Sequence, residues 1–417
     1  MRTVAGLDLC NDVSQISVAE QKDNGRIEVD TLPVEVGSEK FCIHTCAMKY
    51  SGRQEWIFGE EAYRAPMDAG HLLNGLLDLA VSSEYVTVDG QEYDTVTLLS
   101  HFIRSTLRGI TFKGDWPEKP VLFITVRDLS PKILKTVKKA AEKLELNEVD
   151  IRFLSHAESC FYYTASQAQE LKLHKVCLLD YDNKTVRSSI LNTNRQMRPV
   201  VTFIEEREFD LPKKDDLEML NICREIMDSE IISSVYLAGV GFEENWTHET
   251  VRYLCMKKRR VFMGMNLYTK GACYAALDIT GIKNITGGEI FLDKDKLKVN
   301  IGIDISSKGQ VVYRSLIEAG INWFEATASL EVMLGEIPEI RIIITPINGE
   351  GERTKVIRTQ GIPERPERAT RALLELEMLS VNELKCTVTD LGLGELFPAT
   401  GNVTTEVMTL NTGGEEV

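Results

Sequence analysis

A short segment near the N-terminus contains side chains of the types that bind transition metals. In "CIHTC", Cys42, His44 and Cys46 occupy alternate positions, so an extended strand would place all three on one face. Thiol and imidazole groups are zinc ligands, but the segment lacks the knuckle or loop spacing of zinc sites and offers no fourth ligand. We therefore interpret the cysteines as core residues and keep a zinc site as the alternative.

Acidic side chains at the ends of strand-like runs are a second group of candidates. Asp8 interrupts the apolar run "VAGLDL" just before a polar bend that contains Asp12, and Asp180 lies in the run "VCLLDYD". Such acids are either turn and strand-end residues of the fold or members of a metal or nucleotide site, since perturbed acids concentrate at functional sites. The sequence leaves both interpretations open.

Composition and charge narrow the class of protein. The 417 residues are 43% hydrophobic and 27% charged, which is typical of a globular protein with two or three domains. The formal net charge of −15 argues against nucleic acid or an anionic membrane as a partner. No apolar run approaches the roughly 18 residues that cross a bilayer, and no signal-peptide pattern follows Met1. We expect a cytoplasmic protein, and the odd count of 9 cysteines favours reduced thiols over a disulfide framework.

Strand-like and helix-like segments alternate through the first two-thirds of the chain. The β-branched run "KPVLFITV" precedes an amphipathic segment with Ser130 as helix N-cap and Pro131 at the first helical position. Helical periodicity also covers residues 93–109, and strand patterns return at 176–191 and 233–241. This alternation indicates an α/β domain.

The pattern becomes almost entirely β from about Gly288 onward, with period-two runs separated by turn residues. A separate all-β module therefore follows the α/β part. We predict an α/β domain over residues 1–277, a linker over 278–296, a β-sandwich over 297–405 and a disordered tail over 406–417.

The order of these segments resembles the DnaK-type (heat-shock-seventy) chaperones of the actin-like ATPase superfamily. The first strand ends in an acid and a hairpin, a later strand carries Asp180, and the strand "YLAGVG" ends in glycines. Residues 152–165 and 268–277 resemble the family's two connecting helices, and residues 339–390 its peptide-binding β-sandwich. The resemblance implies an α/β actin-like ATPase-type two-lobed domain followed by an all-β sandwich. The segment between Asp180 and Val235 is too short for the subdomain that the family inserts there.

The resemblance also implies a site for ATP, with hydrated magnesium held by Asp8 and Asp180. Several positions match the family's nucleotide-binding loops, although the pattern around each is degenerate. They are Asp8, Asn11, Ser14, Asp180, Thr185, Gly239 and Gly241.

Four departures from the family weaken this site. A loop glycine is replaced by Cys10, and Asp12 puts a negative charge where a terminal phosphate would lie. At ~4 Å and an effective dielectric constant of about 20, that charge costs roughly 4 kcal/mol for each unit of like charge. Residues 70–80 lack the family's lysine, and the glutamate that positions the attacking water falls near His156, with Glu158 two positions on. We therefore expect weak or absent ATP binding and ATPase activity.

The β-sandwich is the second place where the resemblance implies binding. The family holds an extended peptide there, and "IGIDISSKGQVVY" matches the first lining strand and its loop. The matching residues are Ile303, Ile305, Ser306 and Val311. Period two places both isoleucines on one face, where they line a peptide channel or fill the sandwich core. The family's helical lid has no counterpart after the sandwich, so bound peptide would exchange quickly.

These observations favour a degenerate DnaK-like chaperone or adaptor that binds extended peptides or protein partners. The α/β part would then serve as a scaffold with little or no enzyme activity. A slow Mg-ATP-dependent chaperone that switches conformation with nucleotide is the alternative. A structural protein that assembles in the manner of actin is a further alternative.

Overall fold

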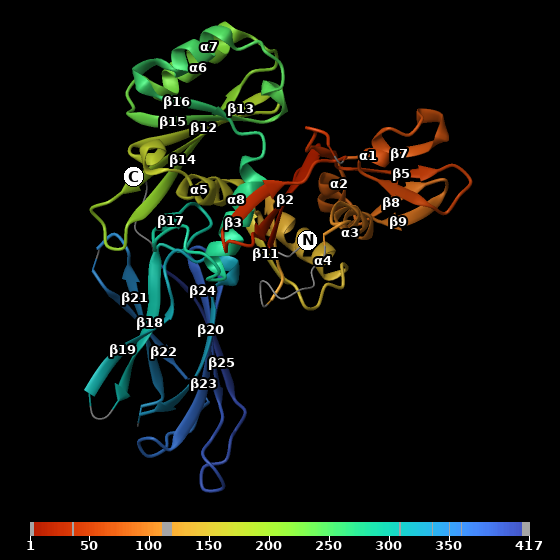
Figure 1. The fold of residues 1–417 in the computed structure, drawn as a ribbon. Helices are drawn as coiled ribbons and strands as arrows, with labels where there is room; N and C mark the ends of the chain where they lie inside the picture. The colour runs from red at the N-terminus through yellow and green to blue at the C-terminus, as the bar shows by residue number, and fades with distance from the viewer. Residues whose placement is uncertain are drawn as a thin grey trace. The chain divides into compact units, whose positions relative to one another are not determined.

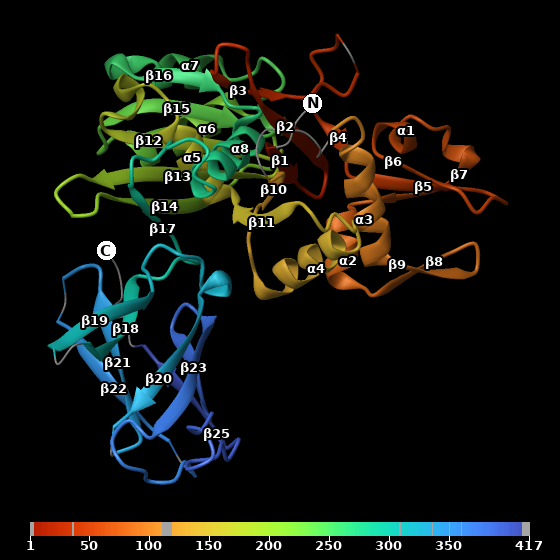
Figure 2. The same ribbon diagram turned by 60° about the horizontal axis from the view of Figure 1, so that its bottom comes forward.

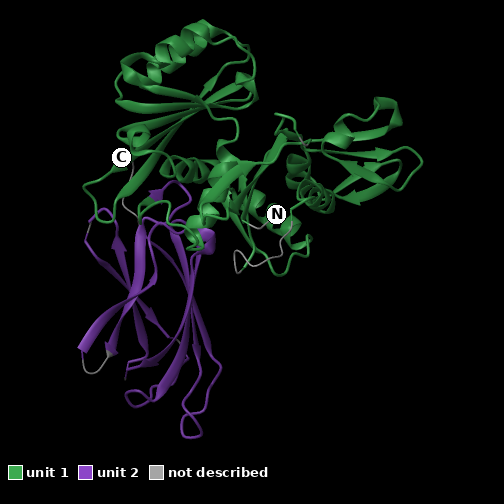
Figure 3. Ribbon diagram, in the orientation of Figure 1, with its two compact units in different colours: residues 1–290 green, residues 291–417 purple. Residues whose placement is uncertain are grey.

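A computed structural model describes residues 4–35, 37–110, 119–307, 310–335, 337–349, 351–359 and 361–410 of the chain. The protein is mixed α/β with several β-sheets, and it divides into two compact units, Met1–Ile290 and Phe291–Val417 (Figure 1, Figure 3). Among the described residues, no helix has both the length and the apolar character that crossing a bilayer requires.

The first large sheet of unit 1 is built around an N-terminal hairpin (Figure 2). Its strand order is β11-β10-β1-β2-β3, with β4 also paired to β2. Strand β1 runs antiparallel to β2 and parallel to β10. The strands are β1 (Val4–Leu9), β2 (Val13–Gln21), β3 (Ile27–Thr31), β4 (Ile43–His44), β10 (Val121–Val126) and β11 (Asp150–Ser155).

The second large sheet repeats this topology. Its order includes β16-β15-β12-β13-β14, and β12 runs antiparallel to β13 and parallel to β15. Each sheet therefore consists of a three-stranded antiparallel meander extended by two parallel strands on the side of its first strand. The strands are β12 (Lys175–Tyr181), β13 (Thr185–Asn194), β14 (Val201–Asp210), β15 (Ile232–Ala238) and β16 (Arg260–Met263).

Two helices, α5 (His156–Ala165) and α8 (Leu267–Ile279), follow the last strand of their respective sheets and cross between the sheets (Figure 1, Figure 2). Glycine permits the crossing, because a Cβ on Gly271 would lie 2.0 Å from the carbonyl oxygen of Ser159. The same applies where α8 packs on β1, since a Cβ on Gly6 would lie 2.4 Å from the carbonyl oxygen of Thr269. Backbone contact at these points fixes the spacing of the two sheets.

The remaining elements of unit 1 surround this core. The helix predicted after Ser130 is confirmed as α4, with Ser130 Oγ accepting a hydrogen bond from Ile133 N at 3.4 Å and Pro131 at the first position. Apart from α5 and α8, the α-helices described in unit 1 are α1 (Glu60–Tyr63), α2 (Leu76–Ser82), α3 (Thr95–Thr106), α4 (Pro131–Glu142), α6 (Asp216–Met227) and α7 (His248–Leu254). The small sheets contain β5 (Cys46–Tyr50), β6 (Trp56–Phe58), β7 (Gly70–Asn74), β8 (Tyr85–Val88) and β9 (Gln91–Asp94).

Unit 2 is a pair of four-stranded antiparallel sheets, with strand orders β19-β18-β21-β22 and β20-β23-β24-β25. Apolar side chains of both sheets form one core, in which Ile301, Ile342 and Leu374 are fully buried. The strands are β18 (Val299–Ser307), β19 (Gln310–Ile317), β20 (Thr327–Leu334), β21 (Glu339–Pro346), β22 (Arg353–Arg358), β23 (Thr370–Ser380), β24 (Glu383–Asp390) and β25 (Val403–Thr409).

The boundaries of the two units differ from the predicted ones. Residues after 277 form an ordered loop, because the Asp278 carboxylate accepts hydrogen bonds from Thr286 N at 3.1 Å and Thr286 Oγ1 at 2.8 Å. Short strand β17 (Ile290–Leu292) also lies in the predicted linker. The prediction that a disordered tail begins at 406 is wrong, since β25 continues to Thr409 in pairing with β24. The rest of that tail, residues 411–417, lies outside the described residues.

We expect Gly271→Ala to destabilise unit 1 by about 1–3 kcal/mol, because the added methyl group meets backbone atoms that cannot move independently. The measurement is the urea dependence of amide hydrogen exchange in α5 and α8. Gly264→Ala is the matched control, since its Cβ would have neighbours no closer than 3.4 Å. Equal stability of the two variants would contradict the proposed backbone contact.

A buried ion pair anchors β24 in unit 2. The Arg365 and Asp390 side chains are 6% and 0% exposed and form two hydrogen bonds, at 2.9 and 3.0 Å. The Asp390 carboxylate also accepts hydrogen bonds from Thr400 Oγ1 at 2.7 Å and Gly392 N at 3.0 Å. Burial alone would raise the pKa of Asp390, but the hydrogen bonds from Arg365, Thr400 and Gly392 outweigh it and hold the pKa well below its usual value.

Asp390→Asn is therefore expected to destabilise unit 2 by about 3–5 kcal/mol at neutral pH, because Arg365 stays buried without its counter-charge. The depressed pKa of Asp390 stabilises unit 2 above the unfolded value of about 3.9, and this contribution is lost as the pH falls below it. Urea-dependent hydrogen exchange in β24 between neutral pH and pH 3 measures both effects. Asp304→Asn, at an exposed position, is the control. If Asp390→Asn had the stability and acid sensitivity of the native chain, the stabilising role assigned to the Arg365–Asp390 ion pair would be wrong.

Candidate functional site

The two aspartates singled out in the sequence occupy equivalent positions in the two large sheets. Asp8 is the penultimate residue of β1, and Asp180 is the penultimate residue of β12. Both are almost completely buried, at 7% and 8% exposure. Helices α5 and α8 begin beside these strand ends and bring His156 and Tyr268, their first and second residues, to the aspartates.

Each aspartate is bound by the ring that its neighbouring helix supplies. His156 Nε2 donates a hydrogen bond to Asp8 Oδ1 at 2.8 Å, and Tyr268 Oη donates one to Asp180 Oδ2 at 2.8 Å. The two rings are stacked, with centroids 3.7 Å apart and planes inclined by 15°. Burial, together with the negative charge of Asp180, raises the pKa of Tyr268 well above its usual value, so the phenol remains a hydrogen-bond donor. The side chains of Asp8, His156, Tyr268 and Asp180 therefore contact one another in that order and join the two sheets.

Cys10 completes a cluster around Asp8. Its Sγ lies 3.3 Å from Asp8 Oδ1 and 3.6 Å from His156 Nε2. Burial and the negative charge of Asp8 raise the pKa of the Cys10 thiol well above its usual value. The thiol is therefore protonated at neutral pH and is a poor nucleophile.

One cation faces these acids. Arg127 Nη1 donates a hydrogen bond to Asp182 Oδ2 at 3.2 Å. Burial alone would lower the pKa of Arg127, but the charges of Asp180 and Asp182 outweigh it and raise the pKa. Arg127 therefore remains charged, and it interacts with the carboxylates of Asp180 and Asp182.

The space between the two sheet ends is a cavity of about 80 Å³. Among the described residues that line it are four aspartates, Asp8, Asp12, Asp180 and Asp182, and one arginine, Arg127. This volume is below the roughly 300–1,000 Å³ of small-molecule sites, and the excess of negative charge repels phosphate groups. A second cavity of about 740 Å³ adjoins it, and residues including Val13, Cys42 and Met265 line both.

The other residues predicted for nucleotide binding have partners within the protein. Asn11 Oδ1 accepts a hydrogen bond from Asp78 N at 3.1 Å, in the first turn of α2. The Ser14 hydroxyl is buried at 2.8 Å from that of Thr45, and Thr185 Oγ1 donates to Asp182 at 3.2 Å. The structure thus brings Asp8, Asp180 and Gly239 to one cavity and directs Asn11, Ser14 and Thr185 to structural hydrogen bonds.

The predicted glycines make room for Tyr181. Gly239 has a φ of 90°, and a Cβ there would lie 2.4 Å from Tyr181 O and 2.5 Å from Asp180 Oδ1. A Cβ on Gly241 would lie 2.1 Å from Tyr181 Cδ1. Both glycines are explained by close packing of β15 and the following turn on β12, of which Tyr181 is the last residue.

The cysteine and histidine residues of "CIHTC" have separate environments. Cys42 Sγ accepts a hydrogen bond from Gln15 Nε2 at 3.1 Å, and Cys46 Sγ donates to Gly59 O at 3.4 Å. His44 pairs with Glu60 and stacks on Tyr63, with ring centroids 3.4 Å apart. In the part of the chain that the structure describes, these residues form no group with ligand-like spacing, whereas Asp8, Cys10 and His156 do.

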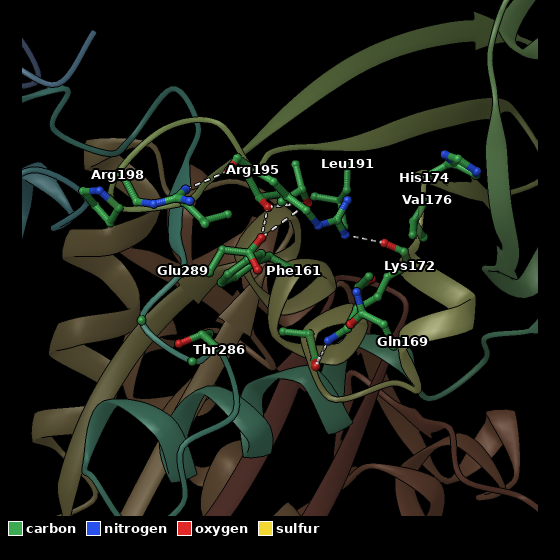
Figure 4. Close-up of a pocket in the computed structure, with 18 residues that line it drawn as sticks. Phe161, Gln169, Lys172, His174, Val176, Leu191, Arg195, Arg198, Thr286 and Glu289 are labelled. Carbon is green, nitrogen blue, oxygen red and sulfur yellow. Dashed lines mark hydrogen bonds between the residues drawn. The ribbon is translucent and has the colours of Figure 1, made fainter. Parts of the chain in front are cut away.

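A further cavity of unit 1, of about 650 Å³, lies between α5, the β13–β14 hairpin and the loop before residue 290 (Figure 4). Arg195, Arg198, Lys172 and Glu289 lie around it. The Arg195 guanidinium donates to the carbonyls of Lys172 at 2.9 Å and Leu173 at 3.0 Å, and Arg198 donates to the carbonyl of Arg195 at 2.8 Å. The Arg195 and Arg198 guanidinium groups are therefore already used in hydrogen bonds to backbone carbonyls of unit 1.

Unit 2 has a cavity of about 560 Å³ between β18 and β20. Three of the four residues predicted to contact peptide, Ile303, Ile305 and Ser306, line this cavity. Val311 does not line it and is 73% exposed on β19. Ile303 is only 3% exposed and also belongs to the sandwich core, so the two interpretations offered for the isoleucines are compatible.

Residues 28–294 match a family of unknown function, DUF5716 C-terminal. The chain belongs to this family. In this DUF5716-family protein, residues 296–410 match a second domain of unknown function, DUF8552. The two matches meet close to the boundary between the compact units. A comparison with curated proteins finds no match.

Sequence reasoning missed the functional potential of four residues, Cys10, Arg127, His156 and Tyr268. Cys10 drew attention only as a replaced glycine, and His156 only as a replaced glutamate. The signal for Cys10 and Arg127 was position, because each directly follows one of the paired strands β1 and β10, which end near Asp8. His156 follows β11, which pairs with β10, and Tyr268 lies in α8, after β16. Neither periodicity nor spacing could show that α5 and α8 of this DUF5716-family chain place two rings against each other.

Asp8→Asn is expected to accelerate alkylation of Cys10 in this DUF5716-family protein. The substitution removes the negative charge that helps to raise the pKa of Cys10, and each unit of pKa decrease gives about tenfold more thiolate. Peptide mass spectrometry after timed iodoacetamide treatment in the presence of a chelator measures the rate. Cys255, which is exposed, serves as internal control in each sample. An unchanged ratio of the two rates would show that Asp8 does not act on the thiol.

Proposed function

We propose that this protein binds extended peptide segments of partner proteins through unit 2, while unit 1 acts as a scaffold with little or no ATPase activity. One observation carries the proposal. Unit 2 has a cavity lined largely by apolar side chains, and two edge strands with exposed apolar side chains, β19 and β20, contribute to its lining. This proposal keeps the resemblance to a degenerate DnaK-type chaperone or adaptor.

The topology of unit 1 supports that resemblance. Two sheets with the same strand order, each followed by a helix that crosses between them, match the duplicated core expected of an actin-like ATPase-type domain. The connection from β12 to β15 contains a hairpin and helix α6, which leaves no room for the family's additional subdomain. One wall of a nucleotide cleft would be missing.

The electrostatics of unit 1 argue against ATP as its ligand. Asp8, Asp12, Asp180 and Asp182 surround the space between the hairpins, and Arg127 pairs with Asp182. A triphosphate adds about four negative charges, each of which costs roughly 4 kcal/mol beside a carboxylate at ~4 Å and an effective dielectric constant of about 20. A hydrated magnesium ion offsets only part of this repulsion. The scaffold role follows from this imbalance.

The cavity of unit 2 has the chemistry of a peptide site. Its lining combines apolar side chains with charges of both signs, a combination that accepts an extended segment with alternating side chains. The apolar lining residues are Ile303, Ile305, Leu330, Val332, Met333, Leu334, Ile337 and Ile340. Ile337 is 71% exposed and Met333 is 45% exposed, so part of this surface is accessible.

Two edge strands contribute residues to the lining of the cavity, β20 with residues 330–334 and β19 with Arg314. Strand β19 ends the order β19-β18-β21-β22, and β20 ends the order β20-β23-β24-β25. Val311, Val312 and Tyr313 on β19 are 73%, 47% and 41% exposed. An edge strand with exposed apolar side chains can pair with an added strand through its backbone. Backbone pairing gives affinity for many sequences, and the cavity selects apolar side chains.

Ile305→Asp and Ile337→Asp are each expected to weaken binding of apolar heptapeptides at least tenfold, about 1.4 kcal/mol, because each places a charge among the apolar side chains that line the cavity. Fluorescence anisotropy of labelled peptides with the full chain measures the effect. Leu396→Asp is the control, since Leu396 is 87% exposed in unit 2 and does not line the cavity. Peptide binding that survives both substitutions would overturn the proposed site.

Calorimetric titration with Mg-ATP is expected to show no binding tighter than the millimolar range. The reason is that Asp8, Asp12, Asp180 and Asp182 around the cavity repel the triphosphate. Binding tighter than this that is abolished by Asp8→Ala or Asp180→Ala would favour the nucleotide-switched chaperone over a scaffold.

A further inference from the structure

We propose that Asp8, Cys10 and His156 form a binding site for a divalent transition metal ion, with zinc as the best match. Asp8 Oδ1, Cys10 Sγ and His156 Nε2 are the ligand atoms, and the fourth coordination position faces the cavity between the two sheet ends. The inference is independent of peptide binding by unit 2.

The separations of the ligand atoms are close to those of a tetrahedral zinc site. Bonds of about 2.0–2.3 Å at tetrahedral angles place neighbouring ligand atoms about 3.3–3.6 Å apart. The observed separations are 3.6 Å for Cys10 and His156, 3.3 Å for Cys10 and Asp8, and 2.8 Å for His156 and Asp8. Only the last pair must open, by about half an ångström on this geometry.

The chemistry of the ligands selects the metal. Magnesium and calcium prefer oxygen ligands throughout, whereas a thiolate and an imidazole favour zinc and neighbouring transition metals. The environment favours a cation in general, because Asp12, Asp180 and Asp182 lie around the same cavity and Arg127 is the one guanidinium in its lining. The charge pattern that opposes a nucleotide therefore supports a metal ion.

The cavity can supply the fourth ligand. Its volume of about 80 Å³ accommodates water molecules, which need about 30 Å³ each in the liquid. The adjoining cavity of about 740 Å³ gives a route of entry past Val13 and Cys42. Three protein ligands with an open fourth position resemble the arrangement of exchangeable zinc sites more than that of closed structural ones.

Metal binding would replace hydrogen bonds that the cluster makes without it. Cys10 loses its thiol proton to solvent, and the proton on His156 moves from Nε2 to Nδ1, so that sulfur and nitrogen each direct a lone pair at the ion. His156 Nδ1 is buried and has no hydrogen-bond partner among the described residues. Because metal-binding histidines normally use that atom to donate a second hydrogen bond, we expect moderate affinity, in the micromolar range.

Titration of the full chain with Co²⁺, a spectroscopic substitute for zinc, tests the proposal. We expect one equivalent to produce d–d bands of a four- or five-coordinate ion together with a sulfur-to-cobalt charge-transfer band. Cys10→Ser should remove the charge-transfer band, and His156→Ala should weaken binding at least tenfold. Cys42→Ser is the matched control, because Cys42 lines the same cavity outside the cluster and should leave the spectrum unchanged.

A second measurement uses the native chain and does not depend on the folding of variants. At a pH where iodoacetamide labels Cys10 measurably, one equivalent of Zn²⁺ should slow that labelling at least tenfold and leave Cys255 unaffected. Absence of a thiolate charge-transfer band in the native chain would overturn the proposal. So would a band that persists in Cys10→Ser or disappears in Cys42→Ser, or equal labelling of Cys10 with and without Zn²⁺.

Discussion

The stacked rings of His156 and Tyr268 are the contact on which the arrangement of unit 1 depends. Each ring donates a hydrogen bond to one buried carboxylate, and the stack joins the two hydrogen-bonded pairs across the boundary between the sheets. Without these partners, Asp8 and Asp180 would be buried charges that cost several kcal/mol each. The ends of β1 and β12 can therefore approach each other only because α5 and α8 begin where they do.

The duplicated topology explains why this contact is nearly symmetric. The same strand order in both sheets puts an acid at equivalent places, and the helix after each fifth strand supplies the partner. The two halves differ in chemistry, since one carries a histidine and a cysteine and the other a tyrosine. Both strand ends therefore face one cavity, but only the half with His156 and Cys10 has a group of side chains with metal-ligand spacing.

Local elements of this structure could be predicted from the sequence, whereas contacts between distant residues could not. Helix α4 was predictable because its N-cap, first-position proline and periodicity are local. Asp8 and Asp180 were identifiable from their place in strand-like runs. The stack was not predictable, because it joins residues far apart in the sequence through two packed helices. The loop after Asp278 and strand β25 were misassigned because a tertiary carboxylate contact and strand pairing, respectively, order segments whose composition resembles a linker and a tail.

The contact of Gly271 with the backbone of Ser159 also limits how unit 1 can move. Where two helices touch main chain to main chain, sliding one along the other would require the helices to separate. Helix α8 also packs on β1, β2, β3 and β10 of the first sheet. The place of Tyr268 beside His156 is therefore set by the same packing that joins the two sheets.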